Sequence, residues 1–336
     1  MITLRELSEI AGVSISTVSK AINNSRDIGL ETKLRVQQIA QQYGYVPSKR
    51  RFNSDRHHGG PVVAVIYSDL TSSYYSRLIE SLDERVHEMG GHLVMANAGF
   101  DTVRIIENMN YFQSIPSIDG ILIISALNVF GELPRVRVPL VGISYPSLEI
   151  HPFDHLCVND GVGIDEAVDT LHKKGHRRIA FISEPFTAHR LDFFKRSMAR
   201  RNIEIDPKLI RVSSERFFEA GYECMKEILR ETEAPTAVFG AYDDIAMGAL
   251  QAIREAGLRV PEDISLLGID DTRQSIGDCR ILASVDCHIA DQADIALGLL
   301  IRKIKEHDFS AVQNVSLHTN FVEHDTVAPA RAQSED

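Results

Sequence analysis

Two glycine-containing patterns resemble sequences that enzymes use, and each departs from its motif at a required position. A Gly-x-Gly pattern at 161–163 follows a short apolar segment, but Glu166 stands where a dinucleotide-binding fingerprint needs its third glycine. A Gly-x-Ser pattern at 142–146 has the serine of a nucleophile elbow, but Pro146 replaces the second glycine. Neither pattern therefore predicts a cofactor or a nucleophilic serine.

Histidine and cysteine spacings also lack the features of a reactive site. His172 with His176, and His151 with His155, are spaced i,i+4 without the adjacent glutamate of a zinc-binding helix, so surface or capping roles are expected. The four cysteines are Cys157, Cys224, Cys279 and Cys287. They form no C-x-x-C pair, so we expect them to be reduced and structural. The sequence predicts a protein that is not an enzyme, with no cofactor and no metal.

Strands and helices alternate from residue 62 onward. The expected strands are 62–66, 92–96, 120–124, 179–182, 237–239 and 264–268. The expected helices are 74–89, 103–112, 163–174, 189–201, 217–231, 244–256 and 291–307. Two runs of this alternation predict two lobes, each an α/β layer structure with a doubly wound parallel sheet. Ligands of such sheets bind beyond the carboxyl ends of the strands.

The first 42 residues predict a different, all-helical unit. Thr3 can cap a helix that ends before Gly12, with a glutamate in the capping-box position. Ser14 can cap a second helix that ends at about Ile22, and a third extends over about 30–42. The residues expected on the inner faces are Leu4, Leu7, Ile10, Ala11, Val18, Ala21, Ile22, Leu34, Val36, Ile39, Ala40 and Tyr43. This arrangement is a helix-turn-helix, whose second helix enters the DNA major groove.

Charge is distributed unevenly along the 336 residues. The formal net charge is −11, yet residues 1–58 hold nine Lys or Arg and five Asp or Glu, a net of +4. The remainder holds 27 basic and 42 acidic residues, a net of −15. A basic head on an acidic body favours DNA binding by the head alone. No secretory signal or membrane-spanning run is present, so we expect a cytoplasmic protein with no membrane partner.

The segment TLRELSEIAGVSISTVSKAIN at 3–23, together with Glu31-Thr32 and 44–47, resembles the N-terminal signature of the lactose-repressor/galactose-repressor family of bacterial transcription regulators. The resemblance extends almost to the C-terminus. It implies a small helix-turn-helix head and a two-lobed body similar to periplasmic binding proteins. The expected parts are a DNA-binding domain at 1–46, a hinge or linker at 47–60, a body at 61–329 and a tail at 330–336. Within the body we expect an N-lobe at about 61–157 and 289–316, and a C-lobe at about 158–288 and 317–329.

The resemblance also implies DNA contacts. Ile15, Ser16 and Lys20 stand at positions similar to the family's base-reading residues, and an isoleucine can press on a thymine methyl while a lysine can reach guanine. Thr17, Ser19 and Asn23 resemble its phosphate contacts. Further expected DNA contacts are Thr3, Arg5, Ser14, Lys49, Arg50, Arg51 and Phe52. The implied partner is double-stranded operator DNA bound by a homodimer, because protein and operator two-folds match.

The linker departs from the family's pattern. In the family it forms a hinge helix on DNA that wedges a leucine into the minor groove. Ser54 stands where that leucine is expected and Arg51 where a small alanine is common. Phe52 is a candidate replacement for the wedge. A flexible, phosphate-binding tether is the alternative.

The expected effector lies where the strands of the body end. The resemblance implies Arg190 and Asp270 most strongly, since Arg190 stands where the family carries its ligand-binding arginine. A guanidinium and a carboxylate in one crevice can hydrogen-bond vicinal hydroxyls, which is consistent with this. An ion pair that closes the strands is the alternative. Tyr242 replaces the family's usual asparagine, which suggests a stacking contact. The expected effector-binding residues are Asp69, Ser73, Tyr74, Arg190, Tyr242 and Asp270. We expect a sugar or related polyol. Asp271 beside Asp270 disfavours a highly anionic ligand unless other basic residues assist Arg190, so an acid sugar or a phosphorylated sugar stays an alternative.

Three classes of function remain to be compared. The leading one is a ligand-responsive, sequence-specific DNA-binding regulator, in particular a repressor. A solute-binding protein or sugar sensor without a DNA role would leave the basic head unexplained, and an enzyme on the doubly wound fold would lack a catalytic set. His324 replaces an arginine of the family, and the tail has no leucine heptads for assembly beyond a dimer.

Overall fold

A computed structural model describes residues 3–22, 27–43, 60–125, 136–146, 152–231, 233–277, 280–306 and 311–331. The chain divides into two compact units, Met1–His58 and Gly59–Asp336. Within the described residues, no helix is both long enough and apolar enough to cross a membrane.

The first unit contains three helices, as predicted. They are α1 (Leu4–Ala11), α2 (Ile15–Ile22) and α3 (Leu30–Gln42), and each packs on the other two. Thr3 and Glu6 form the predicted capping box, and Gly12 ends α1 at φ +63°, a conformation that glycine adopts without strain. The core of this unit consists of Leu7, Ala11, Val18, Ala21, Val36 and Ala40.

Three residues expected on inner faces are exposed instead: Ile10, Leu34 and Tyr43. In α3 the buried face contains Val36 and Ala40, one turn apart. Leu34 lies two positions before Val36, which is about 200° around the helix, so it points away from that face. The prediction was wrong there because it counted apolar residues that do not share one helical stripe.

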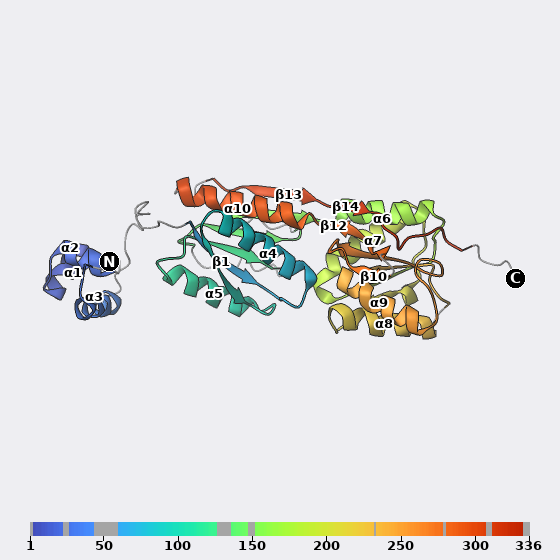
Figure 1. Cartoon of the computed structure of the whole chain (residues 1–336), viewed down its shortest axis with the longest axis horizontal. Helices are drawn as coiled ribbons and strands as arrows, with labels where there is room; N and C mark the ends of the chain where they lie inside the picture. Colours follow the sequence, from blue (N-terminus) through green and yellow to red (C-terminus); the bar gives the residue numbers. More distant parts are fainter. Residues whose placement is uncertain are drawn as a thin grey trace. The chain divides into compact units, whose positions relative to one another are not determined.

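The N-lobe is built on a six-stranded parallel sheet of order β13-β5-β4-β3-β1-β2. Its strands are β1 (Val62–Tyr67), β2 (His92–Asn97), β3 (Gly120–Ile124), β4 (Leu140–Ser144), β5 (Asp154–Asn159) and β13 (Asn314–His318). Helices α4 (Ser73–Glu88) and α10 (Ile289–Glu306) cover one face, and α5 (Thr102–Ser114) covers the other (Figure 1). Along β1, Val63 and Val65 pack toward α4 while Ala64 and Ile66 pack toward α5. Burial of both faces explains why this strand is apolar throughout.

The C-lobe has a second six-stranded sheet, of order β14-β12-β9-β8-β6-β7. Its strands are β6 (Ile179–Ser183), β7 (Ile210–Val212), β8 (Ala237–Gly240), β9 (Ser265–Asp270), β12 (Ala283–Asp286) and β14 (Asn320–Val322). All neighbours are parallel except β12 and β14. Helices α6 (Gly161–Lys173) and α7 (Ala188–Arg200) lie on one face, and α8 (Phe217–Glu231) and α9 (Asp243–Glu255) lie on the other (Figure 1). The predicted fold class is confirmed in both lobes.

Several short elements were not predicted. The strands β10 (Ser275–Gly277) and β11 (Arg280–Ile281) form a separate antiparallel pair, and η2 (Pro185–Thr187) and η3 (Pro207–Leu209) are single 3-10 turns. The strands β7, β12 and β13 were also missed. Each has five residues or fewer, and β13 alternates exposed with half-buried side chains, so none contains a continuous apolar run.

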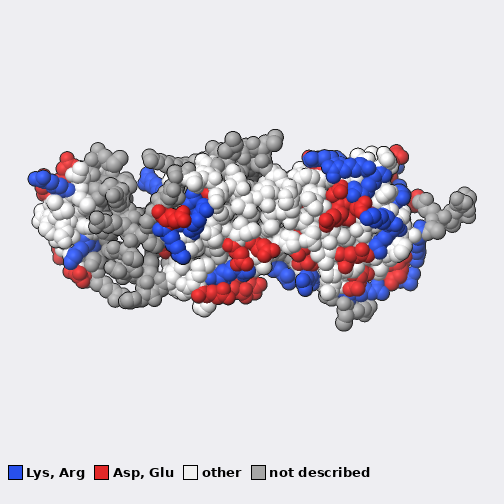
Figure 2. Space-filling model, turned by 90° about the horizontal axis from the view of Figure 1, so that it is seen from above, with Lys and Arg blue, Asp and Glu red and all other residues white. Residues whose placement is uncertain are grey.

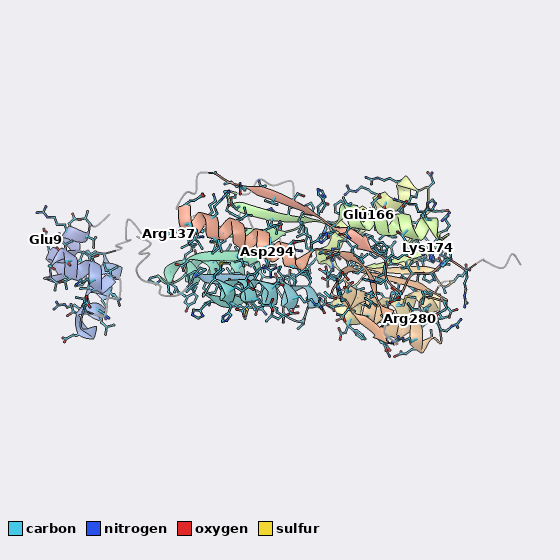
Figure 3. The ribbon with its side chains drawn as sticks, turned by 45° about the horizontal axis from the view of Figure 1, so that its top comes forward. Glu9, Arg137, Glu166, Lys174, Arg280 and Asp294 are labelled. Atoms are coloured by element: carbon cyan, nitrogen blue, oxygen red, sulfur yellow. The ribbon has the colours of Figure 1, made fainter. Side chains whose placement is uncertain are left out.

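The chain passes between the two sheets three times: between β5 and α6, between β12 and α10, and between β13 and β14. The connection from β13 to β14 is anchored on α6, because the Phe321 backbone N–H at its end donates to the Glu166 carboxylate at 2.8 Å. Lys174, just after α6, pairs with Glu323 at 2.8 Å. Glu166 and Lys174 both lie on the side of the C-lobe that carries α6 (Figure 3).

Candidate functional site

The second helix of the head presents the polar face expected of a DNA-reading helix. Ile15, Ser16 and Lys20 are exposed, whereas Val18 and Ala21 are buried against the other two helices. Ser14 caps the helix, since its hydroxyl accepts a hydrogen bond from the Thr17 backbone N–H at 3.1 Å. The expected base-reading side chains therefore lie on one accessible face.

Two basic residues in the described part of this unit form exposed ion pairs. Lys20 Nζ lies 3.3 Å from Asp27 Oδ2, and Arg5 Nε lies 3.6 Å from Glu9 Oε1. Exposed pairs of this kind contribute about 0–1 kcal/mol, so either cation can exchange its partner for a phosphate at small cost. The remaining expected DNA contacts Asn23, Lys49, Arg50, Arg51 and Phe52, together with Ser54, lie outside the described residues.

In the body, Arg190 is the centre of a buried polar cluster. It lies in the first turn of α7 and is 0% exposed. Its Nε donates to Asp160 Oδ2 at 2.7 Å, its Nη2 donates to Asp270 Oδ1 at 3.2 Å, and its Nη1 donates to the Ala241 carbonyl at 2.5 Å. Asp160 follows β5 and Asp270 ends β9, so the carboxyl ends of strands from both lobes supply this cluster.

Two tyrosine rings flank the same guanidinium. The Arg190 Cζ lies 4.9 Å from the Tyr242 ring centroid and 5.1 Å from that of Tyr145. The Tyr145 hydroxyl also accepts from Arg190 Nη2 at 3.4 Å. Tyr145 follows β4 of the N-lobe and Tyr242 follows β8 of the C-lobe, so Arg190 makes contacts that join the two lobes.

The pKa values of the two carboxyl groups in this cluster are shifted in opposite directions. Burial raises the pKa of Asp270 well above its ordinary value, against the opposing charge of Arg190. Burial alone would also raise the pKa of Asp160, but Arg190 and a hydrogen bond from His189 lower it overall. Asp160 is therefore the permanent counter-ion of Arg190.

The structure brings together three of the six expected effector residues, Arg190, Tyr242 and Asp270. The Arg190–Asp270 ion pair, which was the alternative interpretation, is present. Asp160 and Tyr145 were missed, although both follow strands and the strand-end rule would have found them.

The other three expected effector residues make separate contacts. The Tyr74 hydroxyl donates to Gln292 Oε1 at 2.6 Å, and Asp69 accepts from Thr71 at 2.8 Å. Ser73 donates to Asp244 through its backbone N–H at 3.0 Å and through its hydroxyl at 2.6 Å. Because Ser73 begins α4 and Asp244 lies in α9, this pair also links the two lobes.

A hollow of about 390 Å³ lies beside Asp270, between α4, the loop after β9 and the start of α10. Its charged lining residues are Arg77, Glu80, Asp270, Asp271, Arg273, Asp286 and Asp291. Carboxylates outnumber guanidinium groups, which disfavours an anionic occupant, as expected from Asp271. His324, at the position of a family arginine, lies 3.7 Å from Asp271 Oδ1.

Two residues from the patterns considered for catalysis form a cross-strand hydrogen bond. Ser144 Oγ lies 2.8 Å from His155 Nε2, joining β4 to β5. His155 and His176 are both buried, so the expectation of surface histidines was wrong for these two. His176 contacts the Ala328 carbonyl at 2.8 Å and so fastens the C-terminal segment. Within the described residues, no group of three or more His, Cys, Asp or Glu side chains is arranged to hold a metal ion.

The visible face of the body in Figure 2 shows Lys and Arg interspersed with Asp and Glu. A helix-turn-helix unit together with a two-lobed α/β body defines a DNA-binding transcription regulator with a ligand-binding domain. The family profile of bacterial regulatory proteins of the lacI type matches residues 3–48, and that of periplasmic binding protein-like domains matches residues 168–327.

Curated relatives agree with both profiles. The transcriptional repressor PurR of Pasteurella multocida (strain Pm70) is 32% identical over 316 residues, covering 91% of this chain and 93% of the relative. The ribose operon repressor of Haemophilus influenzae is 28% identical over 312 residues, covering 91% and 92%. This chain belongs to the lacI family of bacterial regulatory proteins.

Solved structures share the fold. The lac repressor dimer bound to operator and the anti-inducer ONPF has a TM-score of 0.70 at 22% identity, covering 97% of this chain and 99% of that one. The complex of the transcriptional regulator CelR with cellobiose has a TM-score of 0.68 at 23% identity, covering 97% and 100%.

Proposed function

We propose that this regulator is a repressor whose affinity for operator DNA changes when a small sugar-like effector binds between its two lobes. The observation that carries the proposal is the Arg190 cluster, in which one buried guanidinium contacts residues of both lobes. An effector that replaces these contacts has different affinity for different lobe arrangements. A ligand shifts an equilibrium only through such a difference.

On the DNA side, the proposal assigns Ile15, Ser16 and Lys20 to base contacts and Thr17 and Ser19 to phosphate contacts. The exposure of Ile15, Ser16 and Lys20 on α2 supports the base contacts, and Thr17 and Ser19 beside them are half-buried. The proposed organisation is a reader at 1–46, a linker at 47–60 and an effector-binding body at 61–329. The regulator acts as a homodimer on a two-fold operator, and therefore in the cytoplasm, where its DNA is.

On the effector side, the proposed contacts are Arg190, Tyr242 and Asp270, with Asp69, Ser73 and Tyr74 closing the site from the N-lobe. Relatives support a sugar: three are named ribose operon repressors, and CelR was solved with cellobiose. A lacI-family regulator of Enterococcus faecium was solved with bound ribose.

The DNA assignment is tested by selecting binding sites from a random DNA pool with the full chain. We expect a two-fold symmetric site to be enriched. Lys20→Ala should weaken binding to that site by about 1–3 kcal/mol and relax the base preference at one position of each half-site. Arg35→Ala, a loss of charge on α3, is the control and should leave the base preference intact. If no sequence is enriched, the DNA assignment fails.

The effector assignment is tested with a thermal-shift screen of sugars and polyols on the full chain. A ligand at 100 times its Kd stabilises the native state by about 2.7 kcal/mol, which raises Tm. Arg190→Lys keeps the charge but loses the forked donor geometry, so the ligand-induced rise in Tm should disappear. If the variant responds as the wild type does, the effector binds elsewhere.

A further inference from the structure

A second charged pair, Glu184 with Arg216, lies beside the Arg190 cluster. Glu184 follows β6 and Arg216 precedes α8, so both stand where strands of the C-lobe end. Arg216 Nη2 lies 3.1 Å from Glu184 Oε1. The ring of Tyr242 connects the two clusters, since it contacts Arg190 on one side and packs 5.5 Å from the Phe217 ring.

Phenyl rings from both lobes enclose this pair. The Arg216 Cζ lies 4.0 Å from the ring centroid of Phe100, 4.3 Å from that of Phe217 and 5.1 Å from that of Phe186. Phe100 comes from the loop after β2 of the N-lobe, and its ring stacks on Phe186 of the C-lobe at 4.5 Å. The pair is therefore enclosed only when the lobes are together.

Much of the hydrogen-bonding capacity of this pair is unused. Glu184 is 1% exposed, and its carboxylate oxygens and the guanidinium nitrogens of Arg216 are buried. The carboxylate contacts Arg216 at 3.1 Å and receives a hydrogen bond from Tyr242. A carboxylate can accept about four hydrogen bonds and a guanidinium can donate about five, so these contacts leave most of that capacity without partners. Such buried capacity is costly unless a ligand supplies the partners. The donors of Arg190, by contrast, are bonded to Asp160, Asp270 and Ala241.

We propose that Glu184 and Arg216 form a second effector subsite that takes an uncharged, hydroxyl-bearing ring such as that of a saccharide; this rests on the function proposed above. A hydroxyl can donate to the carboxylate and accept from the guanidinium, as no purely anionic group can. The apolar face of a sugar ring packs on phenyl rings.

Charge balance excludes an anion from this subsite. Arg216 is already neutralised by Glu184, and the neighbouring cluster adds Asp160 and Asp270 against Arg190. Each guanidinium group therefore already has a carboxylate counter-ion, Glu184 for Arg216 and Asp160 for Arg190. A carboxylate or phosphate on the ligand would enter beside these carboxylates and compete with them for the same cations, at a cost that a hydroxyl avoids.

The test is calorimetric titration of the full chain with maltose, cellobiose, ribose and glucose, and with gluconate and glucose 6-phosphate as acidic probes. We expect at least one uncharged saccharide to bind, at least tenfold more tightly than either acidic probe. Glu184→Gln and Arg216→Met should each weaken that saccharide at least tenfold. Glu184→Gln should also strengthen the binding of the acidic probes, because it releases the charge of Arg216. If Glu184 had only a structural role, Glu184→Gln would not weaken saccharide binding and strengthen the binding of the acidic probes at the same time.

Glu262→Gln, which breaks an exposed pair with Arg280 in the same lobe, is the matched control and should bind as the wild type does. Circular dichroism and operator binding verify that each variant is folded; if Arg216→Met is not, Arg216→Lys replaces it.

Preference for an acidic probe, or no binding of any uncharged saccharide, overturns the proposal. Unchanged saccharide affinity in Glu184→Gln and Arg216→Met also overturns it. If Arg190→Lys abolishes saccharide binding while Glu184→Gln and Arg216→Met do not weaken it, the subsite proposal fails but the proposed effector site stands. If Arg190→Lys has no effect either, both proposals fail.

Discussion

At the scale of single residues, the main feature of the body is a set of charged side chains that are buried away from solvent. Arg190 is fully buried, and it is tolerated there because Asp160 and Asp270 accept its hydrogen bonds and two tyrosine rings flank it. A buried ion pair adds little net stability, but removal of one partner leaves an uncompensated charge. The cluster is therefore sensitive to single substitutions.

Asp160→Asn should lower the free energy of unfolding by about 3–5 kcal/mol at pH 7, because it leaves Arg190 without its closest counter-ion. Urea denaturation followed by circular dichroism measures this change. Glu262→Gln removes the partner of an exposed arginine and should cost less than about 1 kcal/mol. Equal losses in the two variants would show that Asp160 is not the counter-ion of Arg190.

Asp243, at the start of α9, predicts a pH dependence of stability. Burial raises its pKa from 3.8 to about 7, against hydrogen bonds from Ser284 and Thr272. Between about pH 4 and pH 7 the folded state therefore holds a proton that the unfolded state has lost. The free energy of unfolding should fall as pH rises through this window, by up to about 1.4 kcal/mol per pH unit, and level off above pH 7.

Asp243→Asn removes this titration while the other buried carboxyls remain. Urea denaturation between pH 4.5 and 8 should therefore show the free energy of unfolding of the wild type falling relative to that of the variant as pH rises. Parallel curves for the two proteins would contradict the raised pKa of Asp243.

At the scale of elements, α8 and α9 pack closely because each presents a glycine to the other. A Cβ added to Gly221 would lie 1.9 Å from the Ile245 carbonyl oxygen, and one added to Gly248 would lie 1.9 Å from that of Phe218. Because the contacted atoms on both helices belong to the backbone, they set the distance between α8 and α9. The pair positions the start of α8, where Arg216 and Phe217 stand.

Gly248→Ala should therefore destabilise the body by more than about 2 kcal/mol, although alanine is the better helix former. Gly298→Ala in α10 is the matched control, because its added Cβ would have no atom within 4 Å. That variant should be as stable as the wild type or more stable, by up to about 1 kcal/mol. Thermal unfolding monitored by circular dichroism compares them; a neutral Gly248→Ala would contradict the close packing.

The sequence predicts a helix or strand well where a local pattern, such as apolar periodicity or a capping residue, is enough to specify it. Periodic apolar runs and capping residues such as Thr3 and Ser14 identified the helices of the head, and buried β1 was evident from its apolar run. The short strands β7, β10 and β13 have no such pattern. The proximity of Arg190 and Asp270 was predictable, because the family resemblance places both after strands whose ends meet at one edge. Their role in binding an effector stays a prediction. The Glu184–Arg216 pair was not, since only the folded chain brings Phe100 of the other lobe against it.

At the scale of the whole molecule, polar contacts hold the lobes of the body together. They include the hydrogen bonds of Ser73 with Asp244 and the contact of Tyr145 with Arg190, and the aromatic stacking of Phe100 on Phe186 and Arg216 adds to them. Each joins residues that follow strand ends on opposite sheets. Contacts of this kind exchange with a ligand more readily than a continuous apolar interface does.

Asp244→Ala should loosen this junction. The Ser73 N–H loses its charged acceptor, so hydrogen exchange in the first turn of α4 should become about tenfold faster, as expected from a loss of 1–2 kcal/mol. Mass spectrometry of a peptide spanning that turn measures the rate. Glu255→Ala, at the other end of α9, should leave it unchanged. Equal protection of Ser73 in wild type and Asp244→Ala would contradict a role of this bond in lobe closure.

The central claim is that occupation of the body changes DNA binding by the head. Its most direct test is the fluorescence anisotropy of a selected operator bound by the full chain, at fixed salt, with and without a saturating concentration of a saccharide shown to bind by calorimetry. Coupling of about 1–3 kcal/mol predicts a change in operator Kd of about 5- to 150-fold. That change should be lost in Arg190→Lys. An operator Kd that stays the same within twofold while the saccharide is bound would contradict the claim.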